Sequence, residues 1–373
     1  MIEEYRICSK CVMDTTDMDI TFNEEGVCNH CVNYDLQMSR LPQGGERDNQ
    51  LKLIVDKIRN NGKGNEYDCI IGLSGGVDST YVAYYVKKIL GLRPLAVHLD
   101  NGWNSELSVM NIENIVKTLD IDLFTYVMDW EEFKDIQLSF LKCSTPDSEI
   151  PTDHAIFTIL RKISKKYKVD YVINGINLKT EGHHPLSWSQ GHIDFGYIKS
   201  VHKLFGSKKI KTFPHGNIFT IFEDRLSSKW VNILNYIDYN KEEAKKLITS
   251  ELGWRDYGGK HFESIYTRFY QGYILPKKFN IDKRKMHFSS LICAGEMTRE
   301  KALEYLKEET YPKELQIEDR EYAIKKFGIT DQEFEEIMNR PVKSYFDYDS
   351  YYGKLLKSKS VKKLIQLLKR FIK

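Results

Sequence analysis

Apolar runs alternate with amphipathic stretches between residues 51 and 240. The runs 68–73, 93–99, 123–127 and 171–174 are short and apolar, as buried strands are. The stretches 51–60, 78–90, 105–119 and 152–167 have the pattern of helices. Strands that alternate with helices predict a parallel sheet with helices on both faces, and therefore an α/β fold.

The pattern changes on both sides of this region. Residues 1–35 are rich in cysteines and turns, and residues 36–50, with Pro42-Gln43-Gly44-Gly45, are expected to be a linker. Beyond residue 240 the chain is mostly helical: Asn240 with Glu243 and Thr330 with Glu333 predict helix starts, and Gly328 predicts a helix end. We therefore expect a module and linker over 1–50, an α/β domain over 51–240 and a helical C-terminal domain over 241–373.

The last twenty residues, KLLKSKSVKKLIQLLKRFIK (354–373), carry eight basic side chains and no acidic one. Their apolar residues fall on one face of a helix. A helix of this kind either packs on its own domain or lies on an anionic membrane surface. The sequence leaves both alternatives open.

Composition narrows the functional class. The 373 residues include 55 Lys and Arg against 53 Asp and Glu, which argues against a protein built mainly to bind nucleic acid. The polar start Met1-Ile2-Glu3-Glu4 does not resemble a signal peptide, and no apolar run is long enough to span a bilayer. We expect a cytoplasmic protein, which the basic tail would bring to the inner face of the membrane if it binds lipid.

Four of the seven cysteines form two CxxC pairs, Cys8 with Cys11 and Cys28 with Cys31. Two such pairs at this spacing predict a zinc site of the zinc-ribbon type. Four thiolates complete the tetrahedral shell, so the Zn²⁺ would be structural and His30 a neighbour of the site. Four ordinary thiols and an iron–sulfur cluster are the alternatives.

The segment YDCIIGLSGGVDST (67–80) places two glycines at the end of a buried strand and the start of a helix. Free backbone N–H groups and the helix dipole make this an anion site, and Gly75 and Gly76 allow close approach of a phosphate. Ser74 and Ser79 offer hydroxyls. Asp78 would either bind Mg²⁺ or cap the helix. The segment fits neither the P-loop pattern GxxxxGKS/T nor GxGxxG.

Polar residues also follow two other predicted strands. Asp100, Asn101 and Gly102 end the second strand, and Gly175 and Asn177 follow the fourth. The carboxyl edge of a parallel sheet is where nucleotides bind. These five residues are therefore candidates for binding a nucleotide, together with the glycine segment.

The hexapeptide SGGVDS resembles the pyrophosphate loop of the PP-loop ATP pyrophosphatase superfamily, whose members cleave ATP between the α and β phosphates. The segment 97–102 resembles the part that holds adenosine there, and 174–181 the corresponding loop of ammonia-using members such as NAD synthetase. The whole chain is similar to the N-acetyl sugar amidotransferases of the WbpG and PseA type. This resemblance rests on CSKCVMDTT and GVCNHC, SGGVDS, YGGKHFES (257–264) and SSLICAG (289–295).

The resemblance implies that an acetamido group on a bacterial surface sugar becomes an acetamidino group, and we expect the sugar to be carried by a nucleotide. The amide oxygen is adenylated by ATP with Mg²⁺, pyrophosphate leaves, and ammonia then displaces AMP. A separate glutaminase and a cyclase-like partner would deliver the ammonia. The residues expected near the reaction centre are Asp78, Lys260, His261 and Glu263, with further candidates in Lys283, Arg284, Lys285, His287, His183 and His184.

An external ammonia source also follows from the residues themselves. A glutaminase needs a nucleophilic cysteine, usually with a histidine. Leu291 stands where a glutaminase elbow has glycine, and no histidine follows Cys293. Cys293 is therefore expected to be a packed thiol.

Two rival functions stay open. A tRNA-thiolating PP-loop enzyme also carries zinc modules, but it needs a sulfur-carrying thiol or a cluster and a basic RNA surface. Here Cys143 and Cys293 are isolated, Cys69 lies in a predicted strand, and the chain without its tail is net acidic. A non-catalytic zinc scaffold that merely binds a nucleotide is the second rival.

Overall fold

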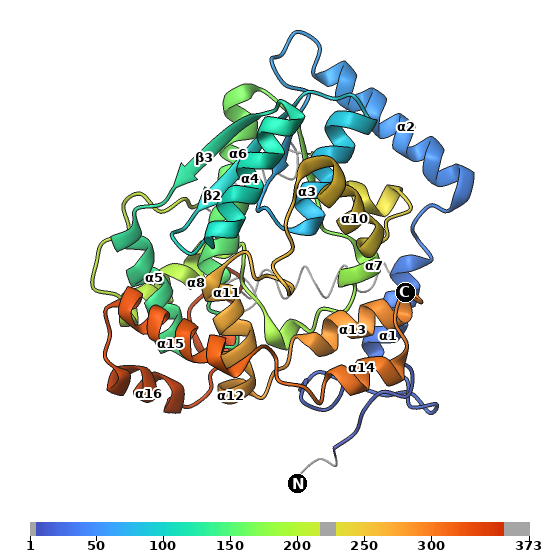
Figure 1. The fold of residues 1–373 in the computed structure, drawn as a ribbon. Coiled ribbons are helices and arrows are strands. Elements are labelled where there is room, and N and C mark those ends of the chain that lie inside the picture. The colour runs from blue at the N-terminus through green and yellow to red at the C-terminus, as the bar shows by residue number, and fades with distance from the viewer. Residues whose placement is uncertain (1–4, 217–228, 354–373) are drawn as a thin grey trace, which may run out of the picture.

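The α/β region is built on a five-stranded parallel sheet, of which β2 and β3 are labelled in Figure 1. The computed structural model describes residues 5–216 and 229–353. The strand order is β3-β2-β1-β4-β5, and Ile71 of β1 pairs with Ala96 and Ile173 of its neighbours. The strands are β1 (Cys69–Gly72), β2 (Pro94–Asp100), β3 (Asp122–Val127), β4 (Tyr171–Asn174) and β5 (Lys229–Asn232). The first four were predicted from the sequence, and β5 was not.

Helices cover both faces of the sheet, as predicted. Alternate strand residues point to opposite faces, so Ile71 packs in one cluster with Ile115 while Ile70 packs in another with Ile163. The first face is covered by α2 (Gly44–Asn61), α3 (Val77–Tyr84) with the π-turn Tyr85–Ile89, α4 (Glu106–Leu119) and α10 (Lys241–Leu252). The second face is covered by α6 (Ile150–Tyr167).

The C-terminal region is helical and lies below the sheet in Figure 1. Asn240 accepts a hydrogen bond from the backbone of Glu243, and Thr330 with Glu333 forms a capping box, so both predicted helix starts are confirmed. Gly328 ends α15 in the left-handed conformation. The elements are α11 (Ile265–Phe269), a π-turn (Tyr270–Ile274), α12 (Leu275–Phe279), α13 (Arg284–Cys293), α14 (Arg299–Tyr305), α15 (Lys313–Phe327) and α16 (Asp331–Asn339).

Two helices of the α/β region pack against this C-terminal region and were not predicted. They are α5 (Trp130–Cys143) and α8 (Phe195–Phe205). Phe133 and Phe140 of α5 share one core cluster with Phe269 and Phe327 of the C-terminal helices. The remaining elements are short: α7 (Leu178–Glu181), η2 (Leu186–Trp188), η3 (Ile233–Tyr236) and η5 (Tyr345–Asp347).

The N-terminal cysteines belong to the same core cluster as the C-terminal helices. Helix α1 (Asn29–Met38) packs beside α13 and α7. The predicted linker over 36–50 is shorter in the structure, because α1 ends at Met38 and α2 begins at Gly44.

Within residues 5–216 and 229–353, no helix is both long and apolar enough to cross a bilayer. The basic segment 354–373 lies outside the described residues, so its predicted amphipathic helix stays a prediction.

Candidate active site

The glycine segment forms a tight turn between β1 and α3. Gly75 has φ +82°, and α3 begins after Gly76 without a side-chain cap. The Ser74 and Ser79 hydroxyls lie 3.1 Å apart, and the Ser74 backbone N–H donates to Ser79 Oγ (3.2 Å). An uncapped helix start beside two hydroxyls is suited to binding an anion.

A cleft of about 1090 Å³ opens beside this turn. It is lined by Ser74 and Ser79, and also by residues that follow β2 and β4 and residues of the C-terminal helices. Of the residues predicted from the sequence, the cleft brings together Ser74, Ser79, Asn101, Asn177, His261 and Glu263. The remaining predicted residues are not part of this lining: Gly75, Gly76, Asp78, Asp100, Gly102, Gly175 and Lys260.

Residues 254–264, called here the strap, lie over the glycine turn. Trp254 Nε1 and the Tyr257 hydroxyl both donate to the Gly75 carbonyl, at 2.8 and 2.9 Å. The strap then runs beside the loop after β2, where the Ser105 N–H donates to the Glu263 carbonyl (2.9 Å). The predicted YGGKHFES segment is thereby held against the predicted phosphate loop.

His261 and Glu263 of the strap reach the cleft together. His261 has φ +64°, an unusual conformation for a non-glycine residue, and its Nδ1 lies 3.5 Å from Glu263 Oε1. Burial alone would raise the pKa of Glu263, but the hydrogen bond and charge of His261 bring this pKa below its ordinary value. Glu263 is therefore an ionised carboxylate at neutral pH.

Lys260 of the strap bonds two residues that line the cleft. Its Nζ donates to Glu181 Oε1 (2.9 Å) and to His287 Nδ1 (3.0 Å). Burial, reinforced by the charge of Lys260, lowers the pKa of His287 well below its ordinary value. His287 is thus neutral, with Nδ1 accepting. It lines the cleft, while its Nε2–H is a buried donor without a partner among the described residues.

Asp78 occupies the first turn of α3 but does not cap it, because the N-cap is Gly76 and no side chain caps the helix. Its carboxylate accepts a hydrogen bond from the Tyr239 hydroxyl and lies 3.6 Å from Lys241 Nζ. Of the two roles expected for Asp78, the capping role is wrong. Binding of Mg²⁺ stays a prediction.

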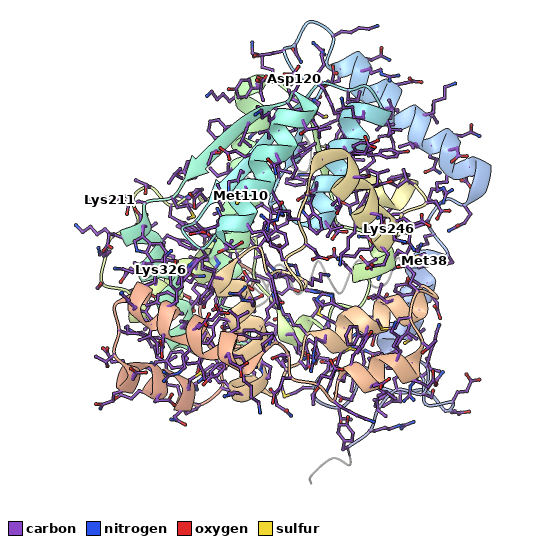
Figure 2. All side chains as sticks on the ribbon, viewed as in Figure 1. Met38, Met110, Asp120, Lys211, Lys246 and Lys326 are labelled. Carbon is purple, nitrogen blue, oxygen red and sulfur yellow. The ribbon has the colours of Figure 1, made fainter. Side chains whose placement is uncertain are left out.

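The residues after β2 make a compact turn. Asp100 Oδ1 accepts from the Gly102 N–H (2.9 Å), and the Gly102 carbonyl accepts from Lys326. Lys326, labelled in Figure 2, reaches this turn from α15, with Nζ 4.9 Å from the Trp103 ring centre. Asn101 alone of the predicted trio lines the cleft, while Asp100 and Gly102 are bonded to each other within the turn.

The loop after β4 packs directly on the phosphate turn. A Cβ at Gly175 would lie 3.0 Å from the Asp78 backbone carbon, so only glycine fits without displacement. Asn177 is buried and caps α7, accepting from the Thr180 N–H (2.9 Å).

Another part of the cleft lining is a polar cluster of Asp147, Glu149, Asp153, His192 and Lys283. Of these five residues, Lys283 was a candidate from the sequence and the other four were missed. His192 Nε2 lies 3.4 Å from both Asp147 and Asp153, and Glu149 accepts from Thr267 (2.5 Å) and Gln271 (3.1 Å). Burial raises the pKa of Asp153 to about 6 and also raises that of Glu149. The three carboxylates stand close together in the sequence, but their convergence with His192 and Lys283 is tertiary.

The basic residues at the start of α13, Lys283 to His287, do not all face the cleft. Lys283 and His287 line the cleft. Arg284 instead pairs with Asp282 (2.7 Å), and Lys285 pairs with the buried Asp14 of the N-terminal module (2.5 Å). His183 and His184 divide in the same way, since His184 lines the cleft and His183 does not.

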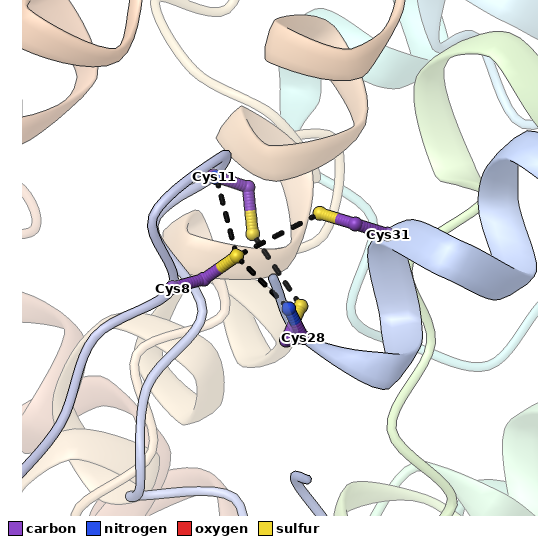
Figure 3. A group of neighbouring side chains, drawn as sticks. All are labelled: Cys8, Cys11, Cys28 and Cys31. Atoms are coloured by element: carbon purple, nitrogen blue, oxygen red, sulfur yellow. Dashed lines mark hydrogen bonds between the residues drawn. The ribbon is translucent and has the colours of Figure 1, made fainter. Parts of the chain in front are cut away.

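The four N-terminal cysteines converge on one point (Figure 3). All four are fully buried, and their sulfur atoms lie within 4.8 Å of one another, with Cys8–Cys31 at 4.0 Å and Cys11–Cys28 at 3.7 Å. Backbone N–H groups, such as that of Cys28 (3.2 Å), point at Cys8 Sγ. Four thiols held in this way fit a tetrahedral metal, and zinc remains the prediction. His30 bonds Asp17 (2.5 Å) and stays outside the group.

Two segments of the chain match known protein families. Residues 263–364 match the family described as LPS biosynthesis protein WbpG-like, C-terminal domain, and residues 49–142 match NAD synthase. A 101-residue segment is 34% identical to the glutamine-hydrolyzing GMP synthase of Pyrobaculum aerophilum, and covers 27% of this chain and 19% of that protein. This chain therefore matches less than a fifth of that relative's length.

Two solved structures are also similar. The NMN synthetase from Francisella tularensis is 15% identical, with 71% of this chain and 92% of that one covered and a TM-score of 0.40. The NH3-dependent NAD synthetase from Campylobacter jejuni is 14% identical, with 80% and 98% covered and a TM-score of 0.32. Taken with the parallel sheet and the SGGVDS turn, the two matched segments show a domain of the PP-loop ATP pyrophosphatase type that includes residues 49–142 and a WbpG-like C-terminal domain over residues 263–364.

Proposed function

We propose that this protein is an ATP-dependent, AMP-forming amidotransferase that converts the acetamido group of a bacterial surface-glycan sugar to an acetamidino group. One observation carries the proposal: a single cleft is lined by both matched segments. Ser74, Ser79 and Asn101 come from the NAD synthase match, and Glu263, Lys283 and His287 come from the WbpG-like match. ATP and the group to be modified would therefore meet in one space.

The proposed reaction has two steps. The amide oxygen attacks the α phosphorus of ATP, and pyrophosphate leaves. Ammonia then adds to the activated carbon and AMP departs with the former amide oxygen, leaving C=NH in place of C=O. Adenylation is needed because an amide carbonyl is a poor electrophile and its oxygen is a poor leaving group.

The phosphate side of the cleft supports the first step. In the proposal, the uncapped α3 start and the Ser74 and Ser79 hydroxyls hold the pyrophosphate, with Gly75 and Gly76 allowing its close approach. Asp78 would hold the Mg²⁺ that accompanies ATP. The adenosine part of ATP would be held by the turns after β2 and β4, which contain Asp100, Asn101, Gly102, Gly175 and Asn177.

The strap supports both steps. Lys260, held by Glu181, would balance charge that builds up as pyrophosphate leaves. His261 and Glu263 would orient the acetamido group or accept the proton that ammonia loses on addition. The neutral His287 accepts a hydrogen bond from Lys260 and so helps to fix the position of that ammonium group beside the cleft.

The polar cluster supports a sugar substrate. The carboxylates of Asp147 and Asp153 and the imidazole of His192 can bond sugar hydroxyls, and Lys283 can bind a phosphate of a nucleotide-activated sugar.

The cleft lining does not favour a tRNA thiolase, which needs a sulfur-carrying thiol. None of the described residues that line the cleft is a cysteine. In the proposal, ammonia comes from a separate glutaminase with a cyclase-like partner, and the cysteine quartet holds a structural Zn²⁺.

The test is formation of AMP and pyrophosphate from ATP and Mg²⁺ with a panel of acetamido-sugar nucleotides and ammonium chloride. A product one mass unit lighter than its substrate is expected. Lys260→Met should lower kcat by at least about 100-fold, since it removes the positive charge bonded to Glu181 and His287 of the cleft lining. Lys134→Met, which removes a surface pair with Glu131, is the matched control and should leave kcat unchanged.

The proposal is wrong if no sugar in the panel supports AMP formation. AMP formation that needs tRNA and a sulfur donor would establish a thiolase instead. If the protein binds a nucleotide but shows no turnover under any of these conditions, the function would instead be that of a non-catalytic zinc scaffold.

A further inference from the structure

Cys31 faces two groups of side chains. On one side lie the other three cysteines of the quartet, and on the other lie Cys293 and His183. Cys31 Sγ is 3.6 Å from Cys293 Sγ and 3.6 Å from His183 Nε2, and the last two atoms are 3.9 Å apart. The prediction of Cys293 as a thiol simply packed in a core misses this arrangement.

These three separations match a zinc coordination shell. Two sulfur ligands at about 2.3 Å from one tetrahedral zinc ion lie about 3.8 Å apart, and a sulfur and a nitrogen ligand lie about 3.6 Å apart. The three atoms therefore form one face of a tetrahedron of the required size. The fourth position is left for water.

The hydrogen bonds of His183 leave Nε2 available as a ligand. The Ser290 hydroxyl donates to the Met286 carbonyl (3.1 Å), so its oxygen accepts from the His183 N–H (3.0 Å) and from His183 Nδ1 (3.2 Å). The proton therefore resides on Nδ1, and the Nε2 lone pair points at the two sulfur atoms. Metal-bound histidines are oriented by a hydrogen bond of this kind at the other ring nitrogen.

The three residues come from three separate segments that the fold brings together. Cys31 lies in α1, His183 follows α7, and Cys293 ends α13. Cys31 and His183 are fully buried, and Cys293 is partly exposed. Thiolate and imidazole ligands of this set favour zinc among the common cellular metals.

We propose that Cys31, His183 and Cys293 bind a second zinc ion, which shares the Cys31 thiolate with the Cys8, Cys11, Cys28 and Cys31 site. The pair of ions would tie α13 and the loop after α7 to the N-terminal module. None of the three residues lines the cleft, so this site stands or falls independently of the proposed reaction.

The first test is the zinc content of the full-length protein, purified without a metal-binding tag and measured by mass spectrometry. We expect two zinc ions per chain in the wild type and one in Cys293→Ser. Cys143→Ser is the matched control, because Cys143 is a buried thiol that bonds Phe140 and Thr145 and is not one of the proposed ligands, and it should keep both ions. One zinc ion in both the wild type and Cys293→Ser would overturn the proposal. Two ions in Cys293→Ser would also overturn it.

A second measurement needs no variant. Zinc X-ray absorption of the wild-type protein should show nitrogen as well as sulfur ligands, and a neighbouring zinc. A shell of four sulfur atoms alone would mean that Cys293 and His183 are only hydrogen bonded to Cys31, and the second site would be rejected.

Discussion

Gly75 shows how much one residue determines in the phosphate turn. It has φ +82°, and a Cβ there would lie 2.9 Å from the Tyr257 hydroxyl and 3.2 Å from the Ser108 carbonyl. Gly75→Ala must therefore displace the strap, and we expect kcat/KM for ATP to fall by about 100-fold, as misplacement of a site by about 1 Å can do. Pyrophosphate release measures this.

The control for that prediction is Gly91→Ala. Gly91 also has a positive φ, +61°, but a Cβ there meets nothing within 4 Å. Both variants carry left-handed strain of about 1–2 kcal/mol, so any difference in activity reports the collision with the strap. Equal activity of the two variants would contradict the role given to the turn.

His154 makes folding stability depend on pH. It is buried, its Nδ1–H donates to the His192 carbonyl (2.8 Å), and its Nε2 has no partner in the described residues. Burial lowers its pKa to about 4, below the ordinary 6.5. As pH falls from 6.5 towards 4, the unfolded chain takes up this proton first, so up to about 3 kcal/mol of stability should be lost.

Urea unfolding at several pH values measures this loss. His154→Asn keeps a donor near the His192 carbonyl but does not titrate. The variant should be less stable than the wild type at neutral pH and should lose less stability on acidification. Parallel pH profiles for the two proteins would exclude His154 as the source.

At the scale of elements, a buried ion pair joins α11 to α15. Arg268 donates to both carboxylate oxygens of Asp319, at 2.8 and 2.7 Å, and only 4% of the Asp319 side chain is exposed. Asp319→Ala leaves a buried guanidinium without a partner and should lower the free energy of unfolding by about 3–5 kcal/mol. Glu335→Ala removes a carboxylate that is 56% exposed and paired with Arg320, and should cost less than about 1 kcal/mol. Similar losses in the two variants, measured by urea unfolding, would contradict this account.

The elements that could be predicted are those with a local signal. β1 and β2 are apolar runs that end in polar turns, and the caps at Asn240 and Thr330 mark helix starts. Helix α5 also has a local signal in the spacing of Phe133, Ile136 and Phe140, and could have been predicted. Strand β5, with the sequence KWVN and an exposed Lys229, could not, because its pairing with β4 is all that defines it.

The residues of the candidate site also fall into those that a local sequence motif predicts and those that only tertiary packing brings together. Ser74, Ser79, His261 and Glu263 stand in recognisable segments and do line the cleft. Asp153 and His192 are 39 positions apart, and only the packing of α6 and the loop before α8 brings them within 3.4 Å. The pairing of Lys260 with His287, and of Cys31 with Cys293, likewise depends on where α13 lies.

At the scale of the whole molecule, the cysteine quartet supports one wall of the cleft from a distance. Arg299 of α14 donates to the Cys8 and Cys11 carbonyls, both at 2.9 Å, and Lys285 of α13 pairs with Asp14. Helix α13 also carries His287 into the cleft. Bound metal, which contributes about 10–16 kcal/mol in small zinc modules, would hold this whole assembly.

Removal of metal should therefore loosen α1, α13 and α14 while the sheet stays folded. After treatment with a zinc chelator, hydrogen exchange should quicken in these three helices, and exchange in α4 and α6, which pack on the sheet, should change little. Catalytic activity should fall together with the protection of α13, because His287 loses its fixed position beside Lys260. Uniform acceleration across all helices would instead mean that the metal holds the entire fold. Unchanged exchange in α13 would mean that the module and the cleft are not coupled.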